Sequence, residues 1–208
     1  MARRLGNPKA ESHLSAADPR LAAIISSVGR CEIKIRDGPF QSLAEAIIYQ
    51  QLAGAAADAI YGRFVKIYRG HFPSPERLIA TSDEKLRAAG LSARKGEYLK
   101  DLAWHIADGR IKPRLLHSMT DEQVIEQLVK VKGIGRWTAE MFLIFCLGRP
   151  DVLPVGDLGL RKAIQRTYSL GDLPTERQIQ DIAKSWKPYC TIATWYLWKS
   201  LEKFKSIG

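Results

Sequence analysis

Apolar residues recur at helical spacing along most of the chain. The pattern predicts a helix from Leu21 that stops at Gly29, a helix over residues 40–52 and another over residues 54–70. Between the first two, residues 31–40 alternate briefly and then turn, which is too short for a sheet. We interpret this stretch as a linker and predict an all-α fold.

Start and stop signals support the helical interpretation. Ser74 precedes Pro75 at a first helical turn, and Gly90 and Gly109 stand where helices would stop. Together the signals predict about ten short helices with brief connections and no strand pairs. Capping-box spacing is found at Thr81 with Glu84, Thr120 with Gln123 and Thr175 with Gln178.

Length and composition set the scale of the fold. The chain has 208 residues, 46% of them hydrophobic, which suits one compact domain or two small subdomains. The sequence contains no run of 18 or more apolar residues, so no membrane span is predicted. Residues 1–19 are basic and lack the apolar stretch of a signal peptide, so we expect a flexible tail before a domain over residues 20–208.

The charge balance points to a polyanionic partner. Lys and Arg total 32 against 22 Asp and Glu, a net charge of +10, which favours nucleic acid. From charge alone, a merely soluble basic protein is an equal alternative. Cys31, Cys146 and Cys190 are far apart, which indicates buried thiols in a reducing cytosol and neither a zinc site nor an iron–sulfur cluster.

The segment Gly133-Ile134-Gly135 is the strongest local signal, lying between two apolar helical patterns over residues 128–146. Glycines allow a sharp turn and a close approach to a ligand, and the helix that follows offers unpaired N–H groups to a phosphate. Lys130, Lys132 and Arg136 surround the turn with positive charge. The alternative is an ordinary pair of antiparallel helices joined by a glycine turn.

Several segments resemble one family. LVKVKGIGRWTAEMFL resembles the helix–hairpin–helix element of DNA glycosylases, and DVLPVGDLGLRKAI resembles the Gly/Pro-rich loop and aspartate that complete the HhH-GPD signature. AIIYQQLAGAAADAI is similar to the family's Gln-Gln segment. GLSARKGEYLKDLA and WKPYCTIATWYLW resemble the alkylation-repair branch, the 3-methyladenine DNA glycosylases. The resemblance covers roughly residues 20–203 and implies two helical subdomains with the active-site cleft between them.

The resemblance identifies Asp157, in the catalytic loop over residues 150–160, as the catalytic carboxylate. A carboxylate near C1′ stabilises an oxocarbenium-like transition state and orients or deprotonates a water. Residue type alone favours a different role, the N-cap of the following helix, and both roles are compatible. Glu45 and Glu140 are the rival carboxylates, but they lie within helical patterns.

Trp137 stands where lyase-active relatives carry a nucleophilic lysine. An indole forms no Schiff base, so the resemblance implies a monofunctional enzyme that uses water. Lys130 and Lys132 are the remaining lyase alternatives and are better suited to phosphates.

The same resemblance implies residues of a base pocket. Trp137 is expected to stack on cationic alkylated purines, with Trp198 and Tyr49 as further pocket candidates. Core packing is the alternative for each aromatic. Met141 stands where some relatives place a pocket tyrosine.

DNA contacts are expected from two segments. Leu52 matches the position of a wedge that fills the gap left by an extruded base, and Gln51 would contact the orphaned partner base. Backbone grip is expected from Lys130, Lys132, Gly133, Ile134, Gly135 and Arg136. The carbonyls of Val129, Val131 and Ile134 would hold a Na⁺ or K⁺ ion that bridges to a phosphate.

These features predict a monofunctional glycosylase that removes alkylated purines from double-stranded DNA in base excision repair. The expected protein is a monomer without a required cofactor or a membrane partner. It would be cytoplasmic and nucleoid-associated, or nuclear in a eukaryote. The alternatives are a non-catalytic helix–hairpin–helix DNA-binding module and a bifunctional glycosylase/lyase.

Overall fold

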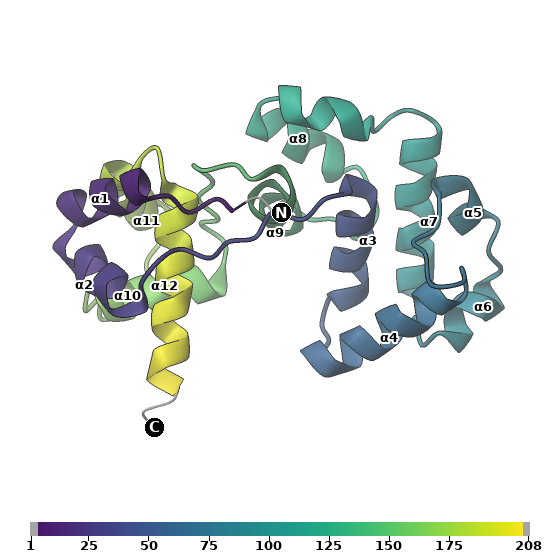
Figure 1. The fold of residues 1–208 in the computed structure, drawn as a ribbon, viewed down its shortest axis with the longest axis horizontal. Helices are drawn as coiled ribbons and strands as arrows, with labels where there is room; N and C mark the ends of the chain where they lie inside the picture. The colour runs from purple at the N-terminus through teal and green to yellow at the C-terminus, as the bar shows by residue number, and fades with distance from the viewer. Residues whose placement is uncertain (1–3, 206–208) are drawn as a thin grey trace. The chain divides into compact units, whose positions relative to one another are not determined.

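The computed structural model describes residues 4–205 and the side chains of residues 4–202. Twelve α-helices and three short helical segments of other types account for the regular structure of this range, and the extended chain contributes a single isolated bridge, between Arg4 and Lys34 (Figure 1). The expected all-α fold is therefore confirmed, with somewhat more helices than the sequence pattern predicted.

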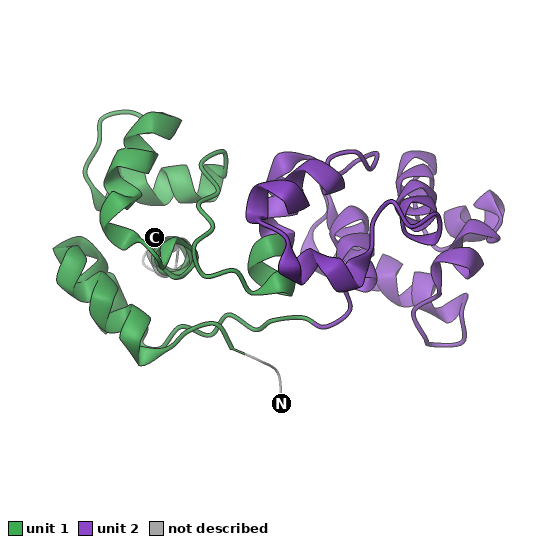
Figure 2. Ribbon diagram, turned by 90° about the horizontal axis from the view of Figure 1, so that it is seen from above, with its two compact units in different colours: residues 1–36, 143–208 green, residues 37–142 purple. Residues whose placement is uncertain are grey.

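The chain divides into two compact units, residues 1–36 with 143–208 (unit 1) and residues 37–142 (unit 2) (Figure 2). Unit 1 contains α1 (Pro8–Ala17), α2 (Pro19–Val28), η2 (Leu143–Leu147), α10 (Leu158–Thr167), α11 (Glu176–Ala183), η3 (Lys184–Trp186) and α12 (Cys190–Lys205). Unit 2 contains α3 (Pro39–Tyr49), α4 (Gly54–Lys66), α5 (Pro75–Ile79), α6 (Asp83–Ala88), α7 (Ala93–Ala107), η1 (Pro113–Ser118), α8 (Asp121–Leu128) and α9 (Arg136–Phe142).

The core of unit 1 is organised around α12, which packs against α1, α2 and α10. The side chains of α12 are buried almost without interruption from Cys190 to Leu197. This helix is therefore surrounded by the core and is not buried along one stripe only. Trp186 and Tyr196 are the largest fully buried side chains here. The hydroxyl of Tyr196 donates to the carbonyl of Gly29 at 2.8 Å, which ties α12 to the end of α2.

The core of unit 2 is organised around α7, which packs against α3, α5 and α6 (Figure 1). Leu99, Leu102 and Ala103 of α7 are completely buried, as are Ile47 of α3 and Phe64 of α4. α7 is therefore a rigid support for the elements that carry most of the predicted DNA contacts.

Two of the three predicted capping boxes are present. Thr120 and Thr175 each accept from the backbone N–H three residues on, and Gln123 and Gln178 complete the reciprocal bonds. The third is wrong, because Ser82 occupies the N-cap of α6. The Thr81 hydroxyl instead donates to the carbonyl of Arg77, in the last turn of α5, at 2.8 Å. It also lies 2.8 Å from the hydroxyl of Tyr68.

The prediction of a flexible tail over residues 1–19 is wrong for the residues that the structure describes. Pro8–Ala17 form α1, Asn7 caps it, and both Ala10 and Leu14 are completely buried. The helix escaped prediction because its apolar stripe is narrow, two buried side chains in ten residues. Residues 1–3 of the predicted tail lie outside the described residues.

Within residues 4–205, no helix has the length and apolar character needed to cross a membrane. The three cysteines are buried free thiols, and no group of three or more His, Cys, Asp or Glu residues in the described part is arranged to hold a metal ion.

If α1 belongs to the core, Leu14→Ala will lower the free energy of unfolding by about 2–5 kcal/mol, because it removes a completely buried side chain. Chemical denaturation monitored by circular dichroism measures this. Ser12→Ala, an exposed position on the same helix, is the matched control and should change stability by less than about 0.5 kcal/mol. Equal stability of the two variants would show that residues 8–17 are dispensable for the fold.

Candidate functional site

The turn between α8 and α9 places its two glycines in different surroundings. Gly133 has φ +80°, and a Cβ atom there would lie 2.0 Å from Cδ2 of Tyr98 on α7. Gly135 has no heavy atom within 4 Å of the position of a Cβ, and its carbonyl accepts from Ala139 at the first turn of α9. Gly133 is thus required by internal packing, whereas Gly135 leaves the backbone open to an external ligand.

Two of the three basic side chains at this turn form ion pairs. The Lys132 ammonium lies 2.5 Å from Glu97, and the Arg136 guanidinium makes two bonds of 2.8 and 2.9 Å to Glu122. Arg136 also contacts Glu140 at 3.2 Å, and it holds the pKa of the Glu122 carboxyl below its usual value. Both pairs are exposed, so a phosphate can exchange with these carboxylates at small cost.

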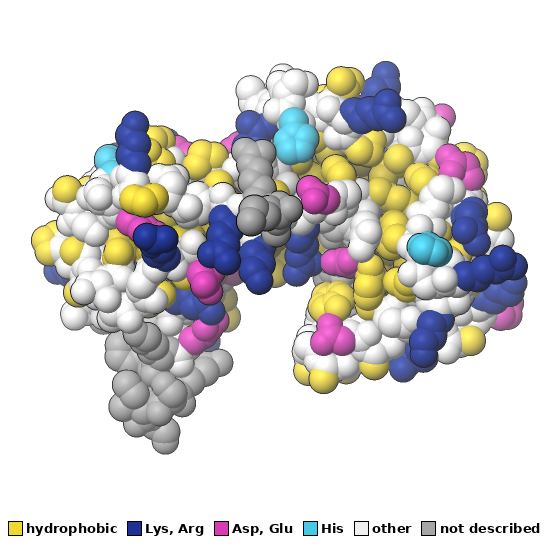
Figure 3. Space-filling model, viewed as in Figure 1, with side chains coloured by type: hydrophobic (Ala, Val, Ile, Leu, Met, Phe, Trp, Pro, Cys, Tyr) yellow, Lys and Arg dark blue, Asp and Glu magenta, His cyan; other side chains and the backbone are white. Residues whose placement is uncertain are grey.

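Lys130 is exposed at the same turn. Over the visible face of each unit, Lys and Arg side chains are interspersed with acidic ones (Figure 3). The positive field that the net charge predicts is therefore broken up locally by carboxylates.

The three carbonyls expected to hold a cation lie in the turn itself. The Val131 carbonyl accepts from the amide of Ile134 at 3.1 Å. The side chains of Val131 and Ile134 are buried and anchor the turn, while Val129 is exposed. A carbonyl oxygen has two lone pairs, so this bond leaves Val131 able to act as a ligand.

Trp137 and Tyr49 line the same pocket of unit 2, with a cavity volume of about 470 Å³. Trp137 is 49% exposed at the start of α9, so it is not a core residue. The alternative of core packing is therefore excluded for Trp137. The remaining lining residues are Ala46, Gln50, Gln51, Thr138 and Met141.

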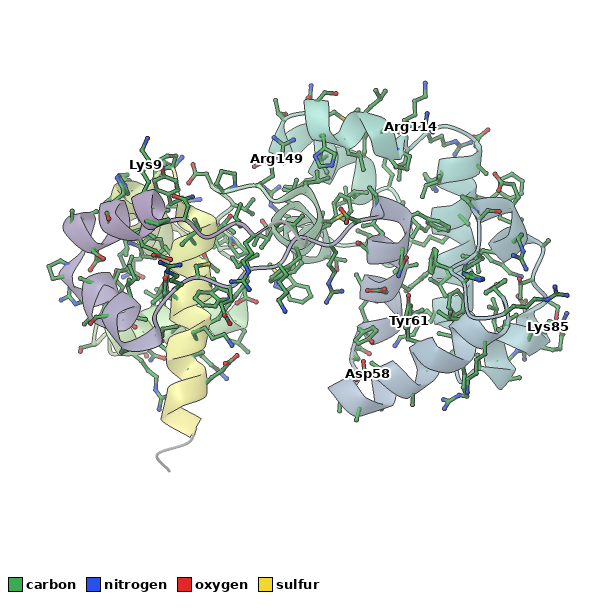
Figure 4. All side chains as sticks on the ribbon, in the orientation of Figure 1. Lys9, Asp58, Tyr61, Lys85, Arg114 and Arg149 are labelled. Carbon is green, nitrogen blue, oxygen red and sulfur yellow. The ribbon has the colours of Figure 1, made fainter. Side chains whose placement is uncertain are left out.

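Tyr49 is held by α4, where Asp58 and Tyr61 are labelled in Figure 4. Its hydroxyl donates to the Asp58 carboxylate at 2.5 Å, and its ring lies 6.3 Å from that of Tyr61. Burial and the neighbouring Glu45 raise the pKa of Tyr61, so this phenol stays protonated. Tyr49 thus presents a fixed aromatic wall to the pocket.

Gln51 and Leu52 form the turn between α3 and α4. Gln51 has φ +56°, a left-handed conformation unusual for a residue with a side chain, and Leu52 is 37% exposed. Leu52 is therefore not a buried leucine at a helix end. The exposed, apolar Leu52 has the character that a wedge needs.

Asp157 lies in unit 1, at the end of the loop that leads into α10. Its Oδ1 atom accepts from the amide of Leu160 at 2.6 Å and from the indole N–H of Trp198 at 2.8 Å. The predicted N-cap role is confirmed by the first bond. The second bond fixes the rotamer of the carboxylate from another helix, α12.

Trp198 was expected to line a base pocket. In the structure its N–H bonds Asp157 and its ring packs on Phe145. The indole stacks on Phe145, with ring centroids 6.2 Å apart and planes inclined by 18°. A Cβ at Gly159 would lie 3.3 Å from the indole and 3.0 Å from Oδ1 of Asp157, so glycine allows this close approach. Trp198 therefore orients Asp157, and stacking of a base on it stays a prediction.

The loop before Asp157 is bonded to the N-terminus of α12 through two residues, Thr191 and Asp151, that no motif in the sequence singles out. The Thr191 hydroxyl donates to the Arg149 carbonyl at 2.7 Å and accepts from the Val152 amide at 2.9 Å. The Asp151 carboxylate accepts from the amide of Cys190 at 3.1 Å. These bonds fix the path of the chain on its way to Asp157.

The rival carboxylates, Glu45 and Glu140, both have hydrogen-bond partners within unit 2. Glu140 is only 5% exposed and accepts from Arg136, and Glu45 accepts from Gln41 at 3.0 Å. Glu45 lies within α3 and Glu140 within α9, whereas Asp157 lies in a loop at the start of a helix.

Comparison with known proteins matches these same segments. A family model described as HhH-GPD superfamily base excision DNA repair protein matches residues 44–188, which include both the glycine turn and the Asp157 loop. The chain belongs to the HhH-GPD superfamily. Its relatives place it in the alkylation-repair branch of that superfamily.

Similar proteins come from a yeast and a bacterium. DNA-3-methyladenine glycosylase 1 of Schizosaccharomyces pombe is 38% identical over 197 residues, covering 92% of this chain and 86% of that protein. The S. pombe 3-methyladenine DNA glycosylase in complex with abasic DNA has a TM-score of 0.83, covering 93% of this chain and 97% of the other. A DNA-3-methyladenine glycosidase from Bacillus halodurans has a TM-score of 0.87 at 39% identity, covering 99% and 94%.

The two glycines give a matched pair of variants. Gly133→Ala should lower the free energy of unfolding by about 2–4 kcal/mol, because alanine meets the Tyr98 ring and adopts an unfavourable φ. Gly135→Ala should change it by less than about 1 kcal/mol, because the space around it is open. Thermal or urea denaturation measures both values. A stable Gly133→Ala protein would contradict the packing argument.

Proposed function

We propose that this protein is a monofunctional DNA glycosylase that extrudes and hydrolytically excises alkylated purines of the 3-methyladenine and 7-methylguanine type. The observation that carries the proposal is Asp157, whose carboxylate is held by Leu160 and Trp198 in the loop that ends the HhH-GPD signature. The names of the relatives support the substrate class, since the similar proteins of S. pombe and B. halodurans are named as a 3-methyladenine glycosylase and a 3-methyladenine glycosidase.

The reaction breaks the bond between the base and C1′. The bonding electrons leave with the base, and the sugar gains oxocarbenium character that the Asp157 carboxylate stabilises. A water adds its oxygen to C1′ and gives up its proton to Asp157 or to solvent. The products are a free base and an abasic site.

Alkylated purines suit this machinery because they are cationic. The positive charge makes the base a good leaving group, so the protein needs little general acid catalysis. An exposed indole face at Trp137 attracts a cation with about 0.5–2 kcal/mol. The same indole replaces the lysine that a lyase would need.

Double-stranded DNA carrying such bases is the proposed partner, bound by a monomer. The open backbone at Gly135 and the exchangeable cations Lys132 and Arg136 support a phosphate contact at the turn. The carbonyls of Val129, Val131 and Ile134 are hard oxygen donors and fit a Na⁺ or K⁺ ion, which would add positive charge beside that phosphate. No other cofactor is part of the proposal.

Asp157→Asn should lower the rate of methylpurine release at least about 100-fold, because the amide cannot stabilise the developing charge or take a proton. Asparagine is also a good N-cap, so α10 should stay intact and binding to abasic duplex DNA should change little. Chromatography of bases released from methylated DNA measures the rate, and a fluorescence titration measures binding. Undiminished release would move the catalytic role to Glu45 or Glu140.

Incubation with abasic-site DNA and borohydride should trap no covalent adduct, because Trp137 offers no amine. A bifunctional glycosylase/lyase treated in parallel is the positive control, detected as a shifted band on a denaturing gel. Efficient trapping would contradict the monofunctional mechanism and direct attention to Lys130 and Lys132. Binding of methylated DNA without base release would instead favour the non-catalytic alternative.

A further inference from the structure

Helix α7 carries three side chains, spaced three residues apart, that hold two distant segments of unit 2. The Lys95 ammonium donates to the carbonyls of Ile48 and Gln50 at 2.6 and 2.8 Å. The Tyr98 ring fills the space that a side chain at position 133 would need. The Asp101 carboxylate accepts from the backbone amide of Lys132 at 2.8 Å.

The two segments are also bonded to each other. The side-chain amide of Gln50 donates to the carbonyl of Gly133 at 2.8 Å, although the residues are 83 positions apart in the chain. The turn after α3 and the glycine turn before α9 are therefore fixed to the same helix and to each other.

Lys95 is well placed for its part of this arrangement. The last carbonyls of a helix have no intrahelical partner, and the end of a helix attracts positive charge. Lys95 supplies both a cation and N–H donors at the end of α3. Lys95 is half-buried, and this desolvation lowers the pKa of its ammonium, while the bonds to the two carbonyls hold it in place.

The residues that follow need such an anchor. Gln51 is held at φ +56°, and a strained conformation persists only where its surroundings determine it. Leu52 comes next and is exposed. The bonds from Lys95 to the carbonyls of Ile48 and Gln50 hold the backbone directly before Gln51, on the path that presents Leu52.

We propose that Lys95 is a positioning residue that, together with Gln50, fixes the Leu52 wedge at a set distance from the phosphate-gripping turn. This inference rests on the proposed function, because it assigns Leu52 the role of gap filler. The inference adds that the glycine turn and the Leu52 wedge form one preformed unit. Binding of the DNA backbone by the glycine turn would then already place Leu52 at the gap. A wedge on a loose loop would have to be ordered each time DNA is bound.

The test separates gap filling from DNA binding and from chemistry. The probe is duplex DNA with 2-aminopurine beside a tetrahydrofuran abasic-site analogue, whose fluorescence changes when a side chain enters the gap. At saturating protein, Lys95→Met should reduce the rate or amplitude of this change by about fivefold or more. Its Kd for undamaged duplex should change by less than about twofold, because phosphate contacts dominate that affinity.

Two further variants and a control complete the design. Lys95→Arg keeps a cation and N–H donors and should restore most of the signal. Gln50→Leu removes the bond to Gly133 while leaving Lys95 in place, and should reduce the signal in the same direction. Lys100→Met is the matched control, since it removes a lysine of the same helix whose partner is the exposed Asp83, and should behave as the wild type.

The outcomes are distinct. A signal in Lys95→Met and Gln50→Leu equal to that of the wild type would overturn the proposal, as would a wild type that gives no gap signal. If Lys95→Met melts below the assay temperature, Gln50→Leu decides alone. A wild type that fills the gap but releases no methylpurine would refute the catalytic function and leave the positioning role of Lys95 standing.

Discussion

The N-terminus of α10 imposes the constraint that fixes the Asp157 carboxylate. The first amides of a helix need an acceptor from outside it, and Asp157 supplies one to Leu160. Because the same oxygen also accepts from Trp198, the carboxylate is fixed from two helices. The cap and the proposed catalytic role are therefore compatible, since the bonds that satisfy the helix would also preorganise the carboxylate for the charge that develops in the proposed reaction.

In unit 2, tertiary contacts fix the position of a backbone turn, as they fix a carboxylate in unit 1. Close packing of Gly133 on Tyr98 and the bonds from Lys95, Gln50 and Asp101 determine where the glycine turn lies. The open backbone at Gly135 is then available to a phosphate. Lys132 and Arg136 are already paired with carboxylates, and exposed pairs of this kind are worth about 0–1 kcal/mol. In the proposed DNA contact, exchange of those partners for phosphates would be close to neutral, so the contact would depend at least as much on backbone geometry as on net charge.

The errors of the sequence interpretation have identifiable physical causes. α1 was predicted as a flexible tail because two buried side chains make too weak a periodic signal. Ser82, and not Thr81, occupies the N-cap position of α6, since the two adjacent hydroxyl residues have nearly the same spacing and the Thr81 hydroxyl bonds Tyr68 instead. The bond between the Trp198 N–H and Asp157 could not be predicted, because it is a contact across 41 residues that no local pattern encodes; stacking of a base on the Trp198 ring stays a prediction.

The sequence by itself determined the helical class, the glycine turn, two capping boxes and the N-cap role of Asp157. These are local features, because periodicity, cap chemistry and glycine requirements act within a few residues. Only the tertiary structure decided which glycine is needed for packing, how Asp157 is oriented and which side chains hold the turn that carries Leu52. Those properties depend on contacts such as Gln50 with Gly133 and Thr191 with Arg149, and side chains from distant parts of the chain meet only when the core brings their helices together.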